Sequence, residues 1–295
     1  MTFAHTASRL LPTGVTARLR PSWHRFHLYL RFLKQGGRIR FDRDLLTIEA
    51  WRTLPGLTPF SVAIRSPREF RRWASFAGNA DDKLYQWLIS CGHDAVLWDI
   101  GSANGLEGCT ALHANKCSVV FVEPFTPSIE SILKSLSLME KRNGEKPKAE
   151  VVQAACTDVP GYGRLITHTK PVAGETFNSI SSGLDTYCQG GRGHMPSSSV
   201  QWVKYVTLDE LHFEAGIALP THLKVDVDGF ERNVLNGGKR VFASDRLRSC
   251  AIEVNDGNGL FVLDFMKAYG FEKVDELVHF DSKTAYTADY FFQRF

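Results

Sequence analysis

Short apolar runs and stretches of helical periodicity alternate along most of the chain. Five runs have the length of a buried strand, and they span residues 96–100, 119–123, 150–155, 223–227 and 250–254. Between them, apolar residues recur at three- and four-residue spacing, which is typical of amphipathic helices. Continuous apolar strands separated by helices indicate a parallel sheet that is covered on both faces. The pattern therefore predicts a doubly wound α/β fold.

Three segments depart from this rhythm. Residues 271–280 and 288–292 can pair as a C-terminal antiparallel hairpin, which brings the expected, mostly parallel sheet to seven strands. The polar, Gly- and Ser-rich segment at about 170–200 is expected to form a lid-like insertion, since a long loop inside a compact domain is usually functional or disordered. Residues 1–60 are expected to form a basic N-terminal extension, helical in part, and residues 61–295 the main domain.

The net charge of +3 hides an uneven distribution. Residues 1–75 carry fourteen Lys and Arg against four Asp and Glu, so the remainder is mildly acidic. A basic amphipathic helix over Pro21–Lys34 could pack on the main domain or lie weakly on an anionic membrane surface. The sequence lacks an aromatic-and-basic recognition motif, and nucleic acid is therefore not an expected partner.

Other features of the composition exclude several classes of protein. No apolar run approaches the ~18 residues of a membrane-spanning helix. The first residues lack the hydrophobic region of a signal peptide, so a cytoplasmic location is expected. The six cysteines include no C-x-x-C pair, so neither a disulfide framework nor a structural zinc site is predicted.

The strongest chemical signal follows the first apolar run, which ends in Asp99 and breaks into a loop with Gly101 and Gly105. Gly101 permits a sharp bend, and Gly105 permits close approach of the backbone to a ligand. Backbone N–H groups at the start of the following helix favour a carboxylate or phosphate. Glu123, which ends the next apolar run, can accept two hydrogen bonds from a ribose diol. Together these features predict a nucleotide-binding site.

The spacing of the glycines distinguishes between nucleotides. A dinucleotide site prefers G-x-G-x-x-G, but Ala103 stands at the middle glycine position. A P-loop is excluded because no Gly-Lys-Ser/Thr follows. The segment from Asp99 to Gly105 instead resembles the first motif of the Rossmann-like methyltransferases that bind S-adenosylmethionine, in which the glycine loop faces the methionine part of the cofactor.

A second set of motifs narrows this resemblance to the FkbM-type methyltransferase family. With the glycine loop and Glu123-Pro124, the set comprises Val206–Leu211, Leu223–Glu231, Val234–Gly238 and Ile252–Val254. The similarity runs from about Phe60 to the C-terminus, and Asp228 stands where a glutamate is common. The resemblance implies a Rossmann-like fold, S-adenosylmethionine as cofactor, and O-methylation of a hydroxyl on a sugar, polyketide or other secondary metabolite.

The acids after the fourth core strand are the candidate catalytic residues. Strands of such a sheet present ligands at their carboxyl ends, which places Asp226 and Asp228 near the reacting methyl group. We expect Asp226 to orient the acceptor hydroxyl or take its proton, with Asp228 and Glu231 assisting. These acids could instead only cap the next helix and shape its loop. The predicted cofactor-binding residues are Asp99, Gly101, Ser102, Asn104, Gly105, Glu123, Cys156 and Thr157.

Several alternatives stay open at this point. The three acids could gather a hard cation such as Mg²⁺, although nothing in the sequence demands a metal and no metal ligands are assigned. Asn79 could reach the methionine end of the cofactor, and His194 in the expected lid is either an acid–base group or a solvated loop residue. The alternative functions are N-methylation, or cofactor binding without catalysis by a membrane-associated module.

Overall fold

A computed structural model of the chain describes residues 29–30, 32–34, 36–76, 82–167, 178–181, 199–227, 229–255, 257–282 and 285–295. Of the helix expected over Pro21–Lys34, residues 29–30 and 32–34 are described, and they are helical. Asn79, His194 and Asp228 lie outside the described residues.

A seven-stranded sheet forms the centre of the fold. Its strands, in spatial order, are β13 (Glu272–Ser282), β14 (Ala285–Gln293), β12 (Ser249–Asn255), β11 (His222–Val225), β4 (Val96–Ile100), β5 (Ser118–Val122) and β6 (Ala149–Val152). β14 runs antiparallel to both of its neighbours, and the other neighbouring pairs are parallel. The predicted doubly wound, mostly parallel sheet with a C-terminal hairpin is confirmed.

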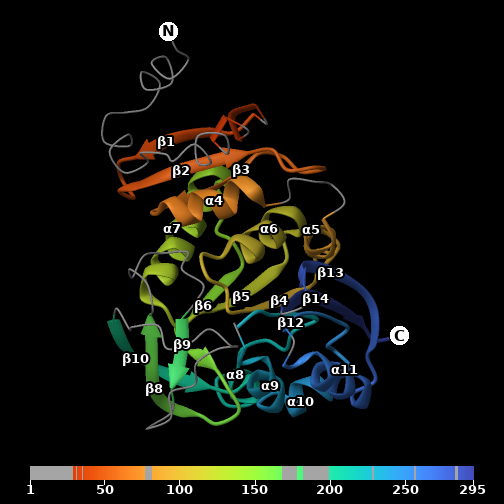
Figure 1. Cartoon of the computed structure of the whole chain (residues 1–295). Coiled ribbons are helices and arrows are strands. Elements are labelled where there is room, and N and C mark those ends of the chain that lie inside the picture. Colours follow the sequence, from red (N-terminus) through yellow and green to blue (C-terminus); the bar gives the residue numbers. More distant parts are fainter. Residues whose placement is uncertain are drawn as a thin grey trace.

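Helices cover both faces of this sheet (Figure 1). One face is covered by α4 (Pro67–Ser75), α5 (Lys83–Ile89), α6 (Leu106–Asn115) and α7 (Thr126–Asn143). The other is covered by α8 (Leu208–Phe213), α9 (Glu231–Asn236), α10 (Lys239–Phe242) and α11 (Gly259–Ala268).

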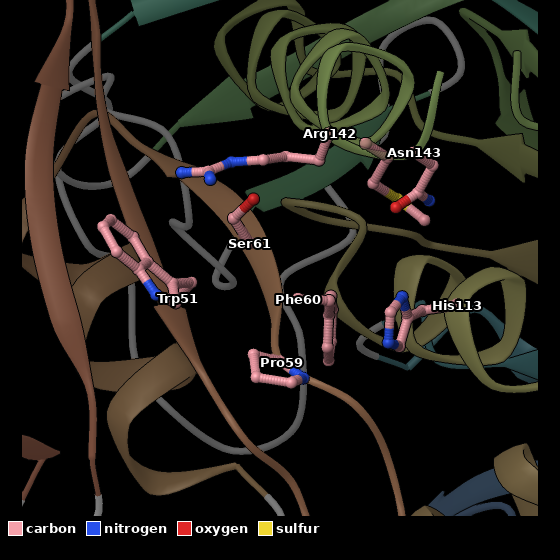
Figure 2. Close-up of a pocket in the computed structure, with 8 residues that line it drawn as sticks. Trp51, Pro59, Phe60, Ser61, His113, Arg142 and Asn143 are labelled. Carbon is pink, nitrogen blue, oxygen red and sulfur yellow. The ribbon is translucent and has the colours of Figure 1, made fainter. Parts of the chain in front are cut away.

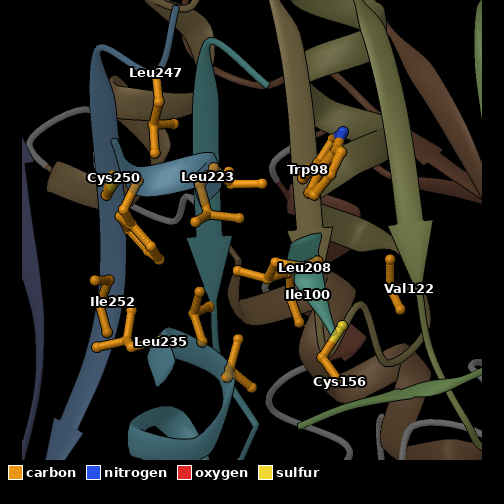
Figure 3. Packing of buried hydrophobic residues seen from close by; sticks show 14 of the residues in the cluster. Trp98, Ile100, Val122, Cys156, Leu208, Leu223, Leu235, Leu247, Cys250 and Ile252 are labelled. Carbon is orange, nitrogen blue, oxygen red and sulfur yellow. The ribbon is translucent and has the colours of Figure 1, made fainter. Parts of the chain in front are cut away.

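Both faces of the central strands are buried because successive side chains point to opposite sides. On β4, Trp98 and Ile100 pack with Leu208 and Leu235 in the core beneath α8–α11 (Figure 3). Leu97 belongs to the separate core beneath α4–α7. Asp99 therefore points toward α4–α7, where it has no exposed surface. The apolar runs read from the sequence are explained by this two-sided burial.

Local signals in the sequence fix where several helices begin. At α4, Ser66 and Glu69 form a reciprocal capping box, and Pro67 occupies the first turn. At α8, Thr207 and Glu210 form a second capping box. Each box satisfies backbone N–H groups that the helix itself leaves unpaired.

A three-stranded antiparallel sheet packs against α7, on the side away from the central sheet (Figure 1). Its order is β1 (Arg38–Asp42), β2 (Thr47–Arg52) and β3 (Phe60–Ile64). The sequence predicted neither β1 nor β2. Because β2 pairs with β3 along its length, residues expected in an N-terminal extension share a sheet with the main domain.

A four-stranded accessory sheet lies between β6 and β11 in the chain. Its order is β7 (Ala155–Cys156), β10 (Ser199–Val206), β8 (Gly161–Thr167) and β9 (Asn178–Ser181). Leu165, Val203 and Tyr205 on its inner face form a small core with Phe125, which follows β5. Most of the lid-like insertion expected at about 170–200 lies outside the described residues.

The cysteines among the described residues behave as small buried hydrophobes. Five of them are free and buried, namely Cys91, Cys109, Cys117, Cys156 and Cys250. Among the described helices, none is long and apolar enough to cross a bilayer.

Candidate functional site

The candidate site lies where the chain order of the central sheet reverses. From β4 the chain proceeds to β5 and β6 on one side, and it returns to β11 and β12 on the other. Open α/β sheets bind their ligands beside the loops that follow two such strands, which are β4 and β11 here. Two segments that are more than 120 residues apart in the sequence meet there, the glycine loop and Asp226, the first residue after β11.

Gly101 is in contact with the backbone of β11. It has a φ of +78°, and a Cβ placed on it would lie 1.9 Å from the Asp226 carbonyl oxygen. The Asp226 N–H donates to the Ile100 carbonyl at 3.0 Å, so the two loops are joined directly. Only glycine fits this position, both by conformation and by space.

The next residues of the loop bind the end of β5. The Ser102 hydroxyl donates to the Asp99 carbonyl at 2.6 Å. Ala103 has a φ of +48°, and its N–H donates to Glu123 Oε2 at 2.8 Å. Gly105 has a φ of +74°, and a Cβ there would lie 2.7 Å from Ile132. The loop is therefore held in one conformation by its own side chains and by β5.

Asn104 is the least satisfied residue of the loop. Its side chain is 4% exposed, and its Oδ1 is buried without a hydrogen-bond partner in the described part of the chain. A buried amide oxygen without a donor costs free energy, so this position is suited to a donor from a ligand. The predicted cofactor-binding role of Asn104 is consistent with this unused acceptor.

Glu123 has contacts that the sequence prediction did not include. Oε2 accepts from Ala103 N–H, and Oε1 accepts from Phe125 N–H, each at 2.8 Å. Burial raises the pKa of Glu123 to about 7, against the lowering effect of these two bonds. Each oxygen retains a further acceptor position for a ribose hydroxyl. The residue thus holds the glycine loop in addition to its predicted role.

Asp99, Lys224 and Asp226 form a buried charged row on the face covered by α4–α7. Lys224 pairs in register with Asp99 on β4, and Asp226 follows two residues later on the same side of β11. Lys224 Nζ lies 3.2 Å from Asp226 Oδ2 and 3.7 Å from Asp99 Oδ1. The Gly108 N–H of α6 donates to Asp99 Oδ2 at 3.1 Å.

The two acids of this row differ in their titration. Burial raises the pKa of Asp99 to about 6, although the Lys224 ammonium lowers it. Burial by itself raises the pKa of Asp226. The positive charges of Lys224 and then Arg72 lower this pKa by more than burial raises it, so it lies below its usual value. Asp226 is therefore an ionised carboxylate at neutral pH, and it is also the less buried of the two.

Glu231 is placed differently from Asp226. It has no exposed surface, its Oε1 accepts from Gly229 N–H at 2.9 Å, and its Oε2 accepts from Asn258 Nδ2 at 2.6 Å. Asn258 in turn accepts from the Asn255 N–H at the end of β12. Glu231 thus connects the loop after β11 to the loop after β12.

A family comparison agrees with this arrangement of motifs. The model of the FkbM methyltransferase domain matches residues 99–273, which is more than half of the chain. The chain belongs to the FkbM methyltransferase family. The resemblance noted in the sequence is confirmed.

Three solved methyltransferase structures align with this FkbM-family chain. The FkbM methyltransferase of Methylobacillus flagellatus aligns at 12% identity and a TM-score of 0.43, covering 68% of this chain and 44% of that chain. The precorrin-6y C5,15-methyltransferase of Geobacter metallireducens aligns at 11% identity and 0.40, covering 74% and 90%. An rRNA methylase of Streptococcus thermophilus aligns at 10% identity and 0.40, covering 71% and 93%. The chain thus spans less than half of the first protein's length. No curated protein matches the sequence.

The two predicted cofactor-binding residues Cys156 and Thr157 lie next to the core. The Cys156 side chain is 4% exposed and packs with Ile100, Leu208 and Leu235 (Figure 3). The Thr157 hydroxyl donates to Asp158 Oδ1 at 3.0 Å, and Asn233 of α9 donates to the same oxygen. The roles predicted for Cys156 and Thr157 therefore stay predictions.

Two cations of the site were not singled out from the sequence. Lys224 is a lone charged residue inside an apolar strand, and such a residue is rarely buried unless it is paired. Arg72 of α4 pairs with Glu107 of α6 at 3.2 Å and lies close enough to lower the pKa values of Asp226 and Glu123. The position of Lys224 within an apolar strand could have indicated a buried, paired charge. Nothing in the sequence of α4 indicated that Arg72 lies at the site.

A separate cavity of about 120 Å³ opens between the three-stranded sheet and the ends of α6 and α7 (Figure 2). It is lined by Trp51, Pro59, Phe60, Ser61, His113, Met139, Arg142 and Asn143. His113 is near the end of α6 that is remote from the glycine loop. None of the predicted site residues lines this cavity.

Within the described residues, no group of three or more His, Cys, Asp or Glu side chains is arranged to hold a metal ion. The carboxylates of the charged row are paired with Lys224 rather than gathered around a vacant centre.

Proposed function

We propose that this chain transfers a methyl group from S-adenosylmethionine to a hydroxyl oxygen of a small molecule or glycan. The observation that carries the proposal is the junction of two motifs, because the glycine loop after β4 contacts the backbone of Asp226 after β11. A cofactor bound by the loop would lie beside an ionised carboxylate. Family membership supports methyl transfer, and the hydroxyl acceptor is what the resemblance to the FkbM-type family implies.

The residues present fit the cofactor. Among the described residues, none donates a hydrogen bond to the buried Asn104 Oδ1 or to Asp99 Oδ1, which has the Lys224 ammonium at 3.7 Å. The N–H groups at the start of α6 favour the cofactor's carboxylate, and Glu123 retains acceptor positions for its ribose. When bound, S-adenosylmethionine supplies an electrophilic methyl group on a positively charged sulfur.

Asp226 orients the acceptor hydroxyl and accepts its proton. A hydroxyl is a weak nucleophile until it is oriented, and an ionised carboxylate can accept its hydrogen bond and fix its direction. Asp226 would accept the proton that the acceptor hydroxyl loses when the methyl group leaves sulfur for oxygen, because a hydroxyl oxygen that gains a methyl group becomes strongly acidic. A carboxylate with a lowered pKa is a sufficient base, because the acceptor hydroxyl loses its proton only after its bond to the methyl carbon has begun to form.

Glu231 positions the loop that carries this carboxylate. Its bonds to Gly229 N–H and Asn258 fix the segment after β11 relative to the segment after β12. We therefore assign Glu231 a positioning role in place of direct assistance. Asp228 remains a proposed assisting acid.

Calorimetry with S-adenosylmethionine, followed by assays of S-adenosylhomocysteine release, tests the proposal. The acceptor panel contains glycans, hydroxylated metabolites, primary amines and a structured RNA, each with and without a chelator. We expect cofactor binding, and release that requires a hydroxyl and is insensitive to chelation. Turnover with amines would indicate N-methylation, binding without turnover would indicate a non-catalytic module, and the absence of cofactor binding would refute the proposal.

The variant Asp226→Asn separates binding from chemistry. The amide keeps the size of the side chain but cannot take a proton, so turnover should fall by about 10²-fold or more while the cofactor still binds. Full turnover in this variant would remove Asp226 from the mechanism. Glu210→Gln, which alters the capping box of α8, is the matched control and should retain turnover.

A further inference from the structure

Lys224 is the most completely enclosed cation of the site. It is 3% exposed, although lysine is among the residues least often found fully buried. Its neighbours along β11, Leu223 and Val225, are fully buried in the hydrophobic core on the other face. The ammonium therefore lies in the interior of the sheet, where a charge is tolerated only if it is paired.

The partners of Lys224 belong to the two halves of the site. Asp99 precedes the glycine loop, is fully buried and lies 3.7 Å from Nζ, whereas Asp226 lies 3.2 Å from Nζ and its side chain is 31% exposed. These strands are neighbours only because the chain order reverses between β4 and β11. One cation thus bridges an acid on the cofactor side and an acid on the acceptor side.

Other charged groups surround this row from the packed elements. They are Arg72 on α4, Glu107 on α6, Glu231 on α9, His279 on β13 and Asp289 on β14. Arg72 pairs directly with Glu107 at 3.2 Å, and His279 pairs directly with Asp289 at 2.9 Å. The Lys224 ammonium lies 3.2 Å from the Asp226 carboxylate, and of the nearby cations it lowers the pKa of that carboxylate most.

We propose that Lys224 is a positioning residue that keeps the Asp226 carboxylate ionised and oriented beside the glycine loop, so that negative charge faces the sulfonium of the bound cofactor. This inference rests on the proposed function, and it adds a role for a residue that touches neither reactant. Without the ammonium, two carboxylates would remain close together with little compensation, and protonation of one of them would be favoured.

The pair of ligands S-adenosylmethionine and S-adenosylhomocysteine isolates this effect. They share the ribose, the amino group and the carboxylate, and they differ in the methyl group and in the positive charge on sulfur. Titration of Asp99 or Glu123 therefore alters both affinities in the same way. Protonation of a carboxylate near the sulfur instead weakens only the binding of S-adenosylmethionine, which carries a positive charge there. The affinity ratio, defined as the affinity for S-adenosylmethionine divided by the affinity for S-adenosylhomocysteine, reports the charge at the methyl-transfer position. Its measurement requires no knowledge of the acceptor.

Calorimetry of both ligands from about pH 5.5 to about pH 8 tests the proposal with the variants Lys224→Met and Lys224→Arg. In the unaltered chain the affinity ratio should change by less than about twofold over this range. In Lys224→Met we expect the affinity ratio to fall about fivefold or more as the pH is lowered to about 5.5, because Asp226 then takes up a proton. Lys224→Arg keeps the charge and should restore most of the ratio.

Three further measurements exclude a merely structural effect. Asp226→Asn should give a low ratio that does not depend on pH, and the double variant Lys224→Met/Asp226→Asn should match it. Lys204→Met removes an exposed lysine of β10 and should leave the ratio unaltered. Circular dichroism verifies folding of each variant. If Lys224→Met does not fold, the double variant and Lys224→Arg still decide the result.

The outcomes separate this inference from the proposed function. If the unaltered chain binds neither ligand, the proposed function fails. If it binds both, but Lys224→Met shows the same ratio as the unaltered chain at every pH, only the role of Lys224 is refuted. The role is equally refuted if Asp226→Asn leaves the ratio unchanged.

Discussion

At the scale of single residues, Gly101 shows how closely the two halves of the site approach each other. Its φ of +78° is in the left-handed region, and the Asp226 carbonyl occupies the place of a side chain. Gly144, which ends α7, has a similar φ of +70° with open space around it. The two glycines therefore differ in packing but have the same conformational demand.

The variants Gly101→Ala and Gly144→Ala separate the cost of the left-handed backbone from the cost of the missing space for a side chain. Gly144→Ala should cost about 1 kcal/mol of unfolding free energy, from the left-handed backbone alone. Gly101→Ala should cost at least about 2 kcal/mol more and should abolish binding of S-adenosylmethionine, because the loop must move away from β11. Urea denaturation and calorimetry measure both effects. Equal costs for the two variants would contradict the close contact with Asp226.

Glu123 gives the protein a dependence of stability on pH. Its pKa is raised by burial from 4.5 to about 7, so the folded state favours the protonated form. A group with a raised pKa contributes stability that is fully present below its unfolded value and is lost as the pH rises through its folded value. The relevant window is therefore between 4.5 and about 7.

The variant Glu123→Gln removes this titration. The stability of the unaltered chain relative to Glu123→Gln should decline as the pH rises through that window, by about 3 kcal/mol at most. Asp99 also titrates there, but it is common to both proteins and largely cancels in the difference. Urea denaturation at a series of pH values makes the comparison. A difference that is constant with pH would mean that Glu123 is ionised throughout.

At the scale of secondary-structure elements, the three-stranded sheet is attached to α7 through charged side chains. Glu49 of β2 has no exposed surface, and it pairs with Arg142 of α7 at 2.8 Å and with Arg40 of β1 at 2.5 Å. Both guanidinium groups lie near the Trp51 ring, at 5.1 Å and 5.9 Å from its centroid. The neighbouring Asp44 pairs with Lys141 but is 80% exposed.

Replacing these two acids should have unequal effects. Glu49→Ala removes a buried partner of two arginines, which are themselves more than a third exposed, and should cost about 2 kcal/mol. Asp44→Ala removes an exposed pair and should cost less than about 0.5 kcal/mol. Neither should change the affinity for S-adenosylmethionine, because these residues lie at the far end of α7 from β5. Thermal unfolding and calorimetry test this, and a loss of affinity in Glu49→Ala would show coupling between the sheet and the site.

The elements missed from the sequence have a common physical reason. β1 and β2 contain charged residues, and the acids Asp42 and Glu49 are paired with Lys141 and Arg142 of α7, which lie more than 90 residues later in the chain. A strand of this kind is stabilised by its neighbours, since β propensity depends strongly on context. The core strands were predictable because burial on both faces requires apolar residues at nearly every position.

At the scale of the whole molecule, the segment before residue 61 contributes to the core beneath α4–α7. Phe32 and Ala50 have no exposed surface, and β2 pairs with β3 from Ile48 to Arg52. Removal of β1 and β2 would uncover this core and leave β3 with an unpaired edge. An unpaired edge of this kind promotes association between chains.

Two truncated chains test this contribution. A chain that begins at Tyr29 should remain monodisperse and bind S-adenosylmethionine with the affinity of the full chain. A chain that begins at Thr53 should aggregate or lose several kcal/mol of unfolding free energy, because it lacks the partners of β3. Size-exclusion chromatography and thermal unfolding compare them. Normal behaviour of the shorter chain would support residues 1–60 as a separable extension.

The sequence by itself determined the repeated strand–helix units, the glycine loop after β4, and the acids after β11. These depend on local rules, since burial on both faces requires apolar runs and a tight turn requires glycine. Only the tertiary structure decided that β4 and β11 are neighbours, that Gly101 contacts Asp226, and that Lys224 lies between Asp99 and Asp226. Such contacts depend on the order of strands in the sheet, which the periodicity of a chain does not encode. The spatial arrangement converts two separate motifs into one site.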